Sequence, residues 1–322
     1  MLSSSRKKLA ATALGLALLA PVAGAETLVL YTSQPDADAA ATVRAFNEKH
    51  PGITVEVFRS GTSDILGKLA AEFAGGSPQP DLLLIADAVS MELLKADGRL
   101  MAYADAPVDG IPEGLYDADR TYFGTKMITS GIVYNTRASE RPTSWKELTG
   151  PAYANLTVMP SPLYSGAAAY MLAGFSSDAD IGWSFFEEMR ANGLVAVRGN
   201  GAVLQSVASG EKAYGVLVDF MAMNAIKDGS PIGFVFPEEG APAVTEPVAI
   251  LSTARNPDGA RAFVDFILSE EGQKLAVEQG YLPARASAGR PHWLPDDVEV
   301  RLFEADINAV VETIEERKRD FA

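Results

Sequence analysis

A short run of hydroxyl-bearing and glycine residues, Ser60-Gly61-Thr62-Ser63, stands between an apolar β-branched segment and an amphipathic segment. Ser and Thr cap helix N-termini and Gly permits a tight turn, so the run indicates the start of a helix. A helix start also presents free backbone N–H groups and the positive end of the helix dipole, which together bind anions. The run therefore has two interpretations, a plain helix cap and part of an anion-binding site.

Three further junctions of the same kind occur along the chain. Thr32-Ser33-Gln34, Ser165-Gly166-Ala167 and Gly199-Asn200-Gly201 each separate a predicted strand from a predicted helix. In open α/β sheets, ligands lie at the carboxyl ends of the strands, where such junctions meet. Two lobes that face each other there would form a cleft lined by helix N-termini, which suits a small anion.

Catalytic motifs are absent from the sequence. The histidines are His50 and His292, and neither stands near a serine that resembles a nucleophile. No nucleophile elbow, P-loop, dinucleotide-binding glycine motif or zinc-binding H-E-x-x-H occurs. Paired carboxylates could still act on a substrate, so a secreted hydrolase stays an alternative. The pattern favours a binding protein over an enzyme, and we predict no cofactor and no metal.

The first 25 residues are predicted to be a signal peptide. Arg6-Lys7-Lys8 precede an apolar stretch from Leu9 to Val22, and Ala23-Gly24-Ala25 fits a small-x-small cleavage site. The mature chain would begin at Glu26, and its net charge would change from −15 to −18. Such acidity disfavours nucleic acid and anionic membranes as partners. The sequence has no cysteine and no second apolar span, so we expect a soluble monomer in a bacterial periplasm.

The segments around these junctions alternate between strand and helix patterns. In the first third, strands over 27–31, 53–59 and 81–86 alternate with helices over 36–50 and 62–74 and a third that ends near residue 96. This order predicts an open, mostly parallel α/β sheet covered by helices. Similar patterns continue through a second lobe, and Pro257–Gln279 is predicted to be helical and amphipathic.

Several longer phrases resemble one protein family. They are "LYTSQPDADAAATVRAFNEKHPGITVEVF", "PTSWKELTGPAYANLTVMPSPLYSGAAAYML", "VRGNGAVLQSVASGEKAYGVLVDFMAMNAIKDGSPIGFVFPEEG" and "ARAFVDFILSEEGQKLAVEQGYLPAR". The family is that of the periplasmic substrate-binding proteins of ABC importers, of the type first known for ferric iron. The resemblance implies an α/β fold of the two-lobed, type II Venus-flytrap kind with two hinge crossovers. It also implies a membrane ABC permease complex as partner.

The resemblance further implies how the chain is divided. After the signal peptide, residues 26–130 would form the first part of the N-lobe and residues 131–247 the C-lobe. Residues 248–322 would complete the N-lobe and add C-terminal helices that pack across the lobes. The two crossovers would fall near Ile128–Tyr134 and Ala243–Ile250.

The ferric members of the family imply a metal site from which this sequence departs. Their first loop has a His where Ser33-Gln34 stands, their third strand ends in a Glu where Ala86-Asp87 stands, and their tyrosine pair aligns with Asp219-Phe220. Loss of both phenolates disfavours direct iron binding. The residues that bind phosphate in those members are matched by Ser165-Gly166-Ala167 and Asn200. The alternative interpretation is that these residues only cap helices.

Acidic residues take the place of the metal ligands. Asp87, Asp219 and Glu246 would set carboxylates opposite the anion loops, and buried carboxylates need partners. A ligand amine or sugar hydroxyls would serve, although Asp87 could instead cap a helix. We predict a small organic phosphate or phosphonate as ligand, first 2-aminoethylphosphonate and then a sugar phosphate, with ferric iron or a ferric chelate as the alternative. The predicted ligand-binding residues are Thr32, Ser33, Gln34, Ser60, Gly61, Thr62, Asp87, Ser165, Gly166, Ala167, Asn200, Asp219 and Glu246.

Overall fold

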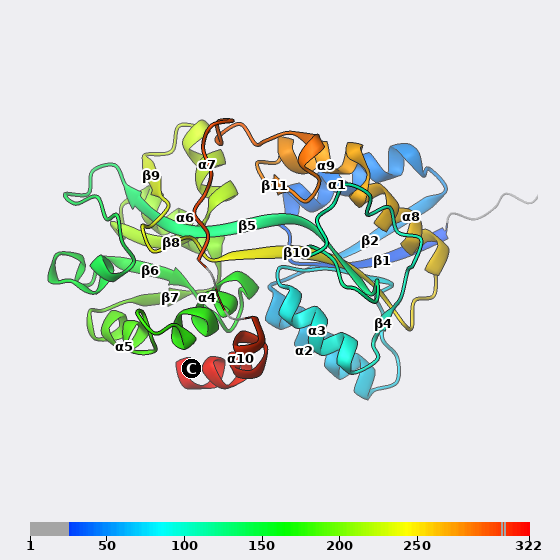
Figure 1. The fold of residues 1–322 in the computed structure, drawn as a ribbon, viewed down its shortest axis with the longest axis horizontal. Helices are drawn as coiled ribbons and strands as arrows, with labels where there is room; N and C mark the ends of the chain where they lie inside the picture. The colour runs from blue at the N-terminus through cyan, green and yellow to red at the C-terminus, as the bar shows by residue number, and fades with distance from the viewer. Residues whose placement is uncertain (1–25, 304, 306) are drawn as a thin grey trace, which may run out of the picture.

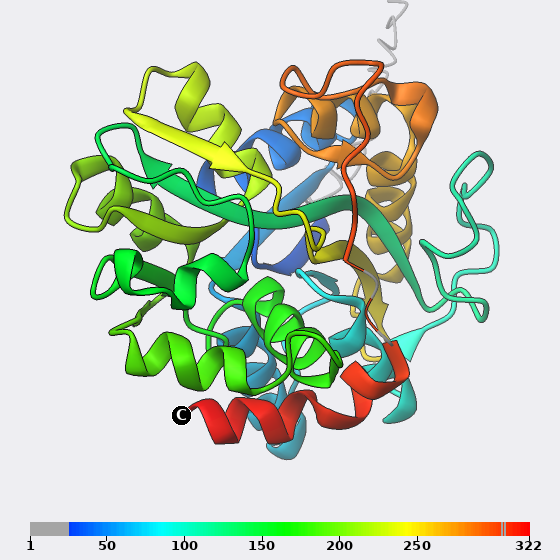
Figure 2. The same cartoon turned by 60° about the vertical axis from the view of Figure 1, so that its left-hand side comes forward.

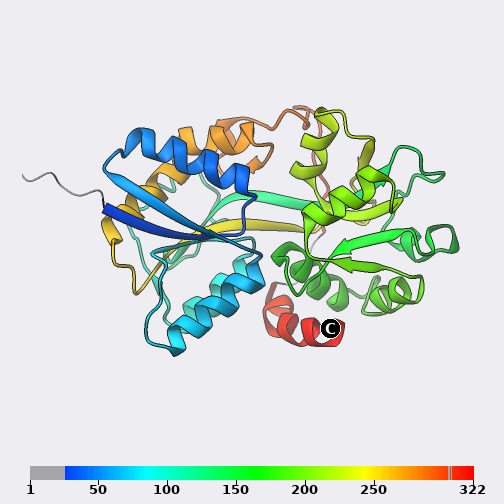
Figure 3. The same cartoon turned by 180° about the vertical axis from the view of Figure 1, so that it is seen from behind.

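The structure is a computed structural model that describes residues 26–303, 305 and 307–322. The predicted signal peptide, residues 1–25, lies outside the described residues. Two α/β lobes lie side by side, and two long strands run from one lobe into the other (Figure 1). Figure 3 shows the same pair of lobes from behind. Among the described residues, no helix combines the length and the apolar character needed to cross a membrane.

The first lobe contains the predicted strand–helix repeats. Strands β2, β1 and β3 lie in that order and pair in parallel, as the alternation in the first third predicts. Strand β3 is buried along its whole length. The elements of this lobe are β1 (Glu26–Thr32), α1 (Asp36–Lys49), β2 (Ile53–Arg59), α2 (Thr62–Ala74), β3 (Leu82–Leu84), α3 (Ala88–Ala96), β4 (Leu100–Met101), α8 (Pro257–Leu268), α9 (Glu270–Glu278), β11 (Leu282–Pro283) and η3 (Ala286–Ala288).

The second lobe repeats the arrangement. Strands β8, β6 and β7 pair in parallel. The small side chains of the Ala-rich helix α4 let it lie almost fully buried. The elements of this lobe are η1 (Lys146–Thr149), η2 (Pro151–Tyr153), β6 (Thr157–Pro160), α4 (Gly166–Ser177), α5 (Ser184–Ala191), β7 (Val195–Val197), α6 (Asn200–Ser209), β8 (Tyr214–Val218), α7 (Asp219–Lys227) and β9 (Ile232–Val235).

Two strands, β5 (Tyr122–Asn135) and β10 (Ala243–Leu251), join the lobes. Strand β5 pairs with β10 as far as Thr129 and with β8 from Ser130 onward, so it changes lobe between these residues. Strand β10 runs antiparallel to β3 and β5, and its register shifts around Glu246. The sheet is therefore parallel among the outer strands and antiparallel at the crossing strands, and it is less parallel than the sequence predicts.

The segment Pro257–Gln279 is helical, as the sequence predicts, but the helix is interrupted. The chain forms two helices, α8 and α9, which are separated at Ser269. The Ser269 hydroxyl accepts a hydrogen bond from the Gly272 N–H at 3.1 Å and so caps α9. The apolar spacing of the segment concealed this cap signal, because serine is a strong N-cap residue and a neutral one elsewhere on a helix.

The C-terminal helix α10 (Ile307–Phe321) contacts both lobes. It packs on α4 of the second lobe and on α3 of the first (Figures 1 and 2). Val310 and Ile314 of α10 share one buried cluster with Val89 of α3 and Ala169 of α4. The helix therefore covers the line along which the two lobes meet.

Candidate ligand-binding site

A cleft of ≈ 340 Å³ lies between the lobes, where strands end and helices begin. Its volume is near the lower end of the range for small-molecule pockets, about 300–1,000 Å³. Both lobes supply its walls. Eight of the predicted residues line it, namely Ser33, Gly61, Thr62, Ser165, Gly166, Ala167, Asn200 and Glu246.

Five helices, α1, α2, α4, α6 and α7, begin at residues that line this cleft, and three of them start at the glycine-containing junctions predicted from the sequence. Helix α2 begins after Gly61, α4 after Ser165 and α6 after Gly199, and these residues all line the cleft. No side chain caps α2 or α6, whereas the Ser165 hydroxyl accepts a long hydrogen bond of 3.4 Å from the Ala168 N–H. Uncapped N–H groups and helix dipoles therefore place partial positive charge at these three junctions, while the carboxylates of Asp36 and Glu246 also line the cleft.

Two polar side chains in the cleft lack partners. The Thr62 Oγ1 and Asn200 Oδ1 atoms are buried and form no hydrogen bond with the described residues. Most buried polar atoms in folded proteins have a partner, so a polar ligand group is the natural one here. Asn200 is not the N-cap of α6, because Gly199 occupies that position with φ of 122°. The plain-cap interpretation therefore does not account for Asn200, while Ser165 does cap its helix.

Two arginines that the sequence analysis missed line the cleft from opposite lobes. Arg59 ends β2 and donates to the Tyr164 hydroxyl at 3.4 Å. The Arg198 guanidinium lies 4.8 Å from the centre of the Tyr164 ring and pairs with Asp64 of the first lobe at 2.8 Å. Arg198 directly precedes Gly199, and Arg59 stands two residues before Gly61. Both glycines precede a helix, and this position was the available signal in the sequence.

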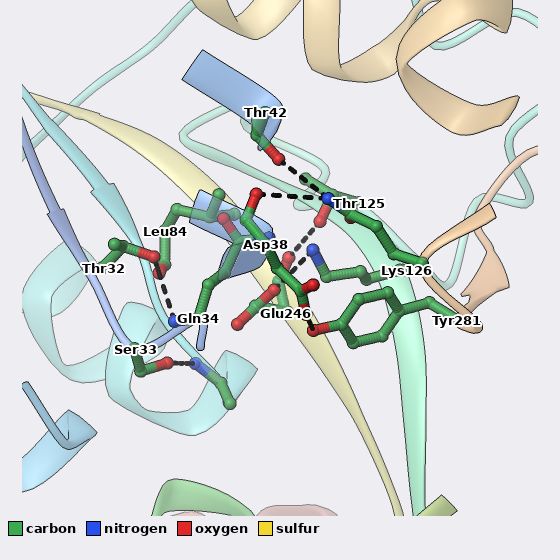
Figure 4. A network of polar contacts seen from close by, with 12 residues as sticks. Thr32, Ser33, Gln34, Asp38, Thr42, Leu84, Thr125, Lys126, Glu246 and Tyr281 are labelled. Atoms are coloured by element: carbon green, nitrogen blue, oxygen red, sulfur yellow. Dashed lines mark hydrogen bonds and ion pairs between the residues drawn. The ribbon is translucent and has the colours of Figure 1, made fainter. Parts of the chain in front are cut away.

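The hinge side of the cleft holds a buried ion pair. Lys126 Nζ on β5 lies 2.7 Å from Glu246 Oε2 on β10, and both side chains are less than 5% exposed. Lys126 also lies over the Tyr281 ring, whose hydroxyl donates to Asp38 Oδ2 at 2.7 Å (Figure 4). Burial raises the pKa of Glu246, and the charge of Lys126 opposes that rise. The protein thus supplies a cation for a carboxylate that we expected the ligand to pair.

Asp219 is not among the residues that line the cleft. Its carboxylate accepts hydrogen bonds from the Thr129 hydroxyl at 2.6 Å and from the Phe220 N–H at 2.7 Å. Burial raises the pKa of Asp219 to about 7, although these hydrogen bonds act to lower it. Its neighbours Val218, Phe220 and Met221 line the cleft instead. A direct contact between Asp219 and the ligand stays a prediction that this geometry does not favour.

The remaining predicted residues lie behind or beside the cleft. The Thr32 hydroxyl donates to the Leu84 carbonyl, the Ser60 hydroxyl donates to Asp64, and Asp87 caps α3. Gln34 is buried, and its side chain lies near Glu246, where it acts to lower the pKa of that carboxyl group. These side chains support the cleft loops, and a ligand contact by any of them stays a prediction.

The two lobes touch across the mouth of the cleft. The Ser63 N–H of the first lobe donates to the Tyr164 carbonyl of the second at 3.4 Å. A Cβ atom at Gly61 would lie 2.6 Å from the Tyr164 ring, and one at Gly166 would overlap the Ala86 carbonyl oxygen. The structure is therefore a closed arrangement, in which two glycines permit backbone approach that no other residue would allow.

Similarity to known proteins covers most of the chain. Residues 77–307 match the family described as "Bacterial extracellular solute-binding protein". A "Probable ABC transporter periplasmic-binding protein y4fP" of Sinorhizobium fredii is 26% identical over 254 residues, which are 75% of this chain and 69% of that protein. A "Putative 2-aminoethylphosphonate-binding periplasmic protein" of Salmonella paratyphi A is 24% identical over 288 residues, 81% and 83% of the two chains. The structure of the periplasmic binding protein AfuA from Actinobacillus pleuropneumoniae, with fructose-6-phosphate bound, superimposes with a TM-score of 0.82 at 23% identity over 92% of this chain and 97% of that one.

Proposed function

The chain belongs to the family of bacterial extracellular solute-binding proteins, and we propose that it captures a small organic phosphate or phosphonate in the periplasm for a membrane ABC importer. Its fold is the type II periplasmic-binding-protein fold, which confirms the predicted fold class. Proteins of this architecture close their lobes around the ligand, and the closed form is the signal to a partner.

The observation that carries the proposal is the group of helix N-termini and guanidinium groups that surrounds one cavity of an acidic protein. Three helix N-termini and the guanidinium groups of Arg59 and Arg198 surround one cavity, while the chain as a whole has a net charge of −15. Helix N-termini bind oxyanions, and a guanidinium group can give a phosphate two parallel hydrogen bonds. The unpartnered Thr62 Oγ1 and Asn200 Oδ1 atoms lie among these groups and would meet the same ligand.

The hinge side of the cleft would bind the other end of the ligand. Tyr281 there lies near three carboxylates, those of Asp38, Asp219 and Glu246, and the cation beside it is Lys126. Of these three carboxylates, Glu246 lines the cleft, and an amine on the ligand would pair with it, so 2-aminoethylphosphonate stays the first candidate. Because Lys126 already pairs with Glu246, neutral hydroxyl groups on the ligand would also suit this part of the cleft. This supports a sugar phosphate as the second candidate. One relative is named as a putative 2-aminoethylphosphonate-binding protein, and one fold neighbour has fructose-6-phosphate bound.

Calorimetric titration of the purified mature protein tests the proposal. We expect 2-aminoethylphosphonate or a hexose phosphate to bind, and ethanolamine or the free hexose to bind at least about a hundredfold more weakly, because they lack the anionic end. Equal binding of the phosphorus-free compounds would contradict the proposal. Tight ferric citrate binding with a strong visible absorption band would support the iron alternative. Turnover of a phosphate ester would support a hydrolase.

The Glu246→Gln variant separates the two ligand candidates. If a ligand amine meets Glu246, the variant should bind 2-aminoethylphosphonate about tenfold to a hundredfold more weakly, since a charge-assisted hydrogen bond contributes roughly 1.5–3 kcal/mol. Ethylphosphonate has no amine and serves as the matched control on the same protein, so any disturbance of Lys126 affects both ligands. Equal losses for the two phosphonates would exclude the amine contact and favour a hydroxyl-bearing ligand.

A further inference from the structure

A buried carboxylate that does not line the ligand cleft lies where the lobes meet. Asp87 caps α3, because its Oδ1 atom accepts a hydrogen bond from the Ser90 N–H at 2.6 Å, and the residue is only 2% exposed. It borders a small void between α2 and α3 of the first lobe and α4 and α10. The charged residues that line the void beside Asp87 are Glu315 and Lys318 of α10.

Two helices cover this carboxylate from the second-lobe side. On α4, a Cβ atom at Gly166 would lie 2.6 Å from Asp87 Oδ2, so the glycine backbone rests against the carboxylate. On α10, Lys318 and Glu315 lie near Asp87, but they pair with each other at 2.7 Å. The residues that α2 and α4 present to the void carry no charge. Among the described residues, Asp87 has no ion-pair partner of its own.

Helix α10 is attached to the second lobe by aromatic contacts. The Phe321 ring lies 6.4 Å from the Phe186 ring, and Arg317 lies over the Trp183 ring. When the lobes separate about the β5 and β10 crossings, α4 and α10 would therefore move away from Asp87 together. Water would then reach the carboxyl group, which the closed arrangement excludes from solvent.

We propose that Asp87 is a positioning residue that links closure of the two lobes, and with it retention of the ligand, to the uptake of a proton. Asp87 acts through the docking of α4 and α10 on the first lobe and makes no contact with the ligand. The inference rests on the proposed function in one respect, namely that ligand binding closes the lobes.

The direction of the pH dependence follows from the burial. Burial raises the pKa of Asp87 from 3.8 to about 6 in the closed arrangement, and the Ser90 hydrogen bonds and the charge of Lys318 oppose that rise. The open arrangement would return the pKa toward 3.8, so the closed form binds more protons between these two values. Acid therefore favours closure. Above a pH of about 6, Asp87 is charged in both arrangements, and closure then carries the full free-energy cost of burying that charge.

The test compares the wild type with Asp87→Asn, since asparagine also caps helices but does not ionise. The ligand's own ionisation affects both proteins equally, so the informative quantity is the ratio of their affinities for one ligand, 2-aminoethylphosphonate or a hexose phosphate. We expect the wild type to gain roughly tenfold relative to the variant between pH 7.5 and pH 5. Calorimetry in buffers of different ionisation enthalpy should show that the wild type takes up close to one proton more than the variant at pH 5.

A second measurement does not depend on the ligand. The radius of gyration of the ligand-free wild type, from small-angle scattering, should fall between pH 7.5 and pH 5, and that of Asp87→Asn should not. Asp87→Ser, which also keeps the cap, replaces the asparagine variant if that one does not fold. An affinity ratio and a radius that are independent of pH would overturn the Asp87 proposal and leave phosphate binding intact. Failure of all phosphorus compounds to bind would overturn the proposed function, and the scattering result would still decide the role of Asp87.

Discussion

Replacing Gly166 by alanine should lower ligand affinity by about a hundredfold or more and leave both lobes folded. The added methyl group would overlap the Ala86 carbonyl oxygen and lie 2.6 Å from Asp87 Oδ2, and both of these atoms belong to the first lobe. Backbone atoms cannot move aside as a flexible side chain can. Alanine is a good helix former at the start of α4, so the open arrangement gains no strain. The variant should therefore stay open and bind the anion with one lobe only.

Calorimetry gives the loss of affinity, and small-angle scattering with saturating ligand shows whether the lobes close. Gly67→Ala in α2 is the matched control, because a Cβ atom there meets nothing within 4 Å. This control should bind normally and gain up to about 1 kcal/mol of stability. Wild-type affinity of Gly166→Ala together with a compact, closed radius would show that the contact between α4 and Ala86 does not limit closure.

Replacing both Arg59 and Arg198 by glutamine should remove most of the affinity for a phosphorus-bearing ligand. Each charge-assisted hydrogen bond contributes about 1.5–3 kcal/mol, so each single variant should bind roughly tenfold to a hundredfold more weakly. Arg198→Gln should have the larger effect, because it also removes the 2.8 Å ion pair that joins the second lobe to Asp64 of the first. The affinity of the double variant should also depend less on salt concentration than that of the wild type.

Titrations at low and high salt on the single and double variants test this prediction. Arg190→Gln is the control, since it makes the same change of charge at an exposed position of α5 outside the cleft. Retention of wild-type affinity by the double variant would mean that the helix N-termini alone hold the anion. The arginines would then serve only to fix Tyr164 between the lobes.

The position of the cleft was predictable from the sequence because it depends on local signals. Strand–glycine–helix junctions can be recognised within a few residues, and parallel strands bring their carboxyl ends to one edge of a sheet. Gly61, Thr62, Ser165, Gly166 and Asn200 all follow from that pattern, and the structure places all five in the cleft wall.

The charges of the cleft were not predictable in the same way. Lys126 and Glu246 are far apart in the sequence and meet only because β5 and β10 pair antiparallel. Asp219 begins α7 where a ligand contact was predicted, but its side chain turns to Thr129 on β5, and sequence spacing does not determine that direction. Arg59 and Arg198 resemble ordinary surface charges until the two lobes are placed together.

The position of β10 in the shared sheet also affects the order in which the molecule can form. Strand β10 lies between β3 and β5, yet the whole second lobe separates it from β5 in the chain. A chain that emerges from its N-terminus therefore completes the strands of the second lobe while the first lobe still lacks a central strand. Pairing across such a long separation is slow, because the intervening segment must first be ordered or closed into a loop. The first lobe's sheet, and with it the cleft, can be completed only after residues 243–251 have emerged.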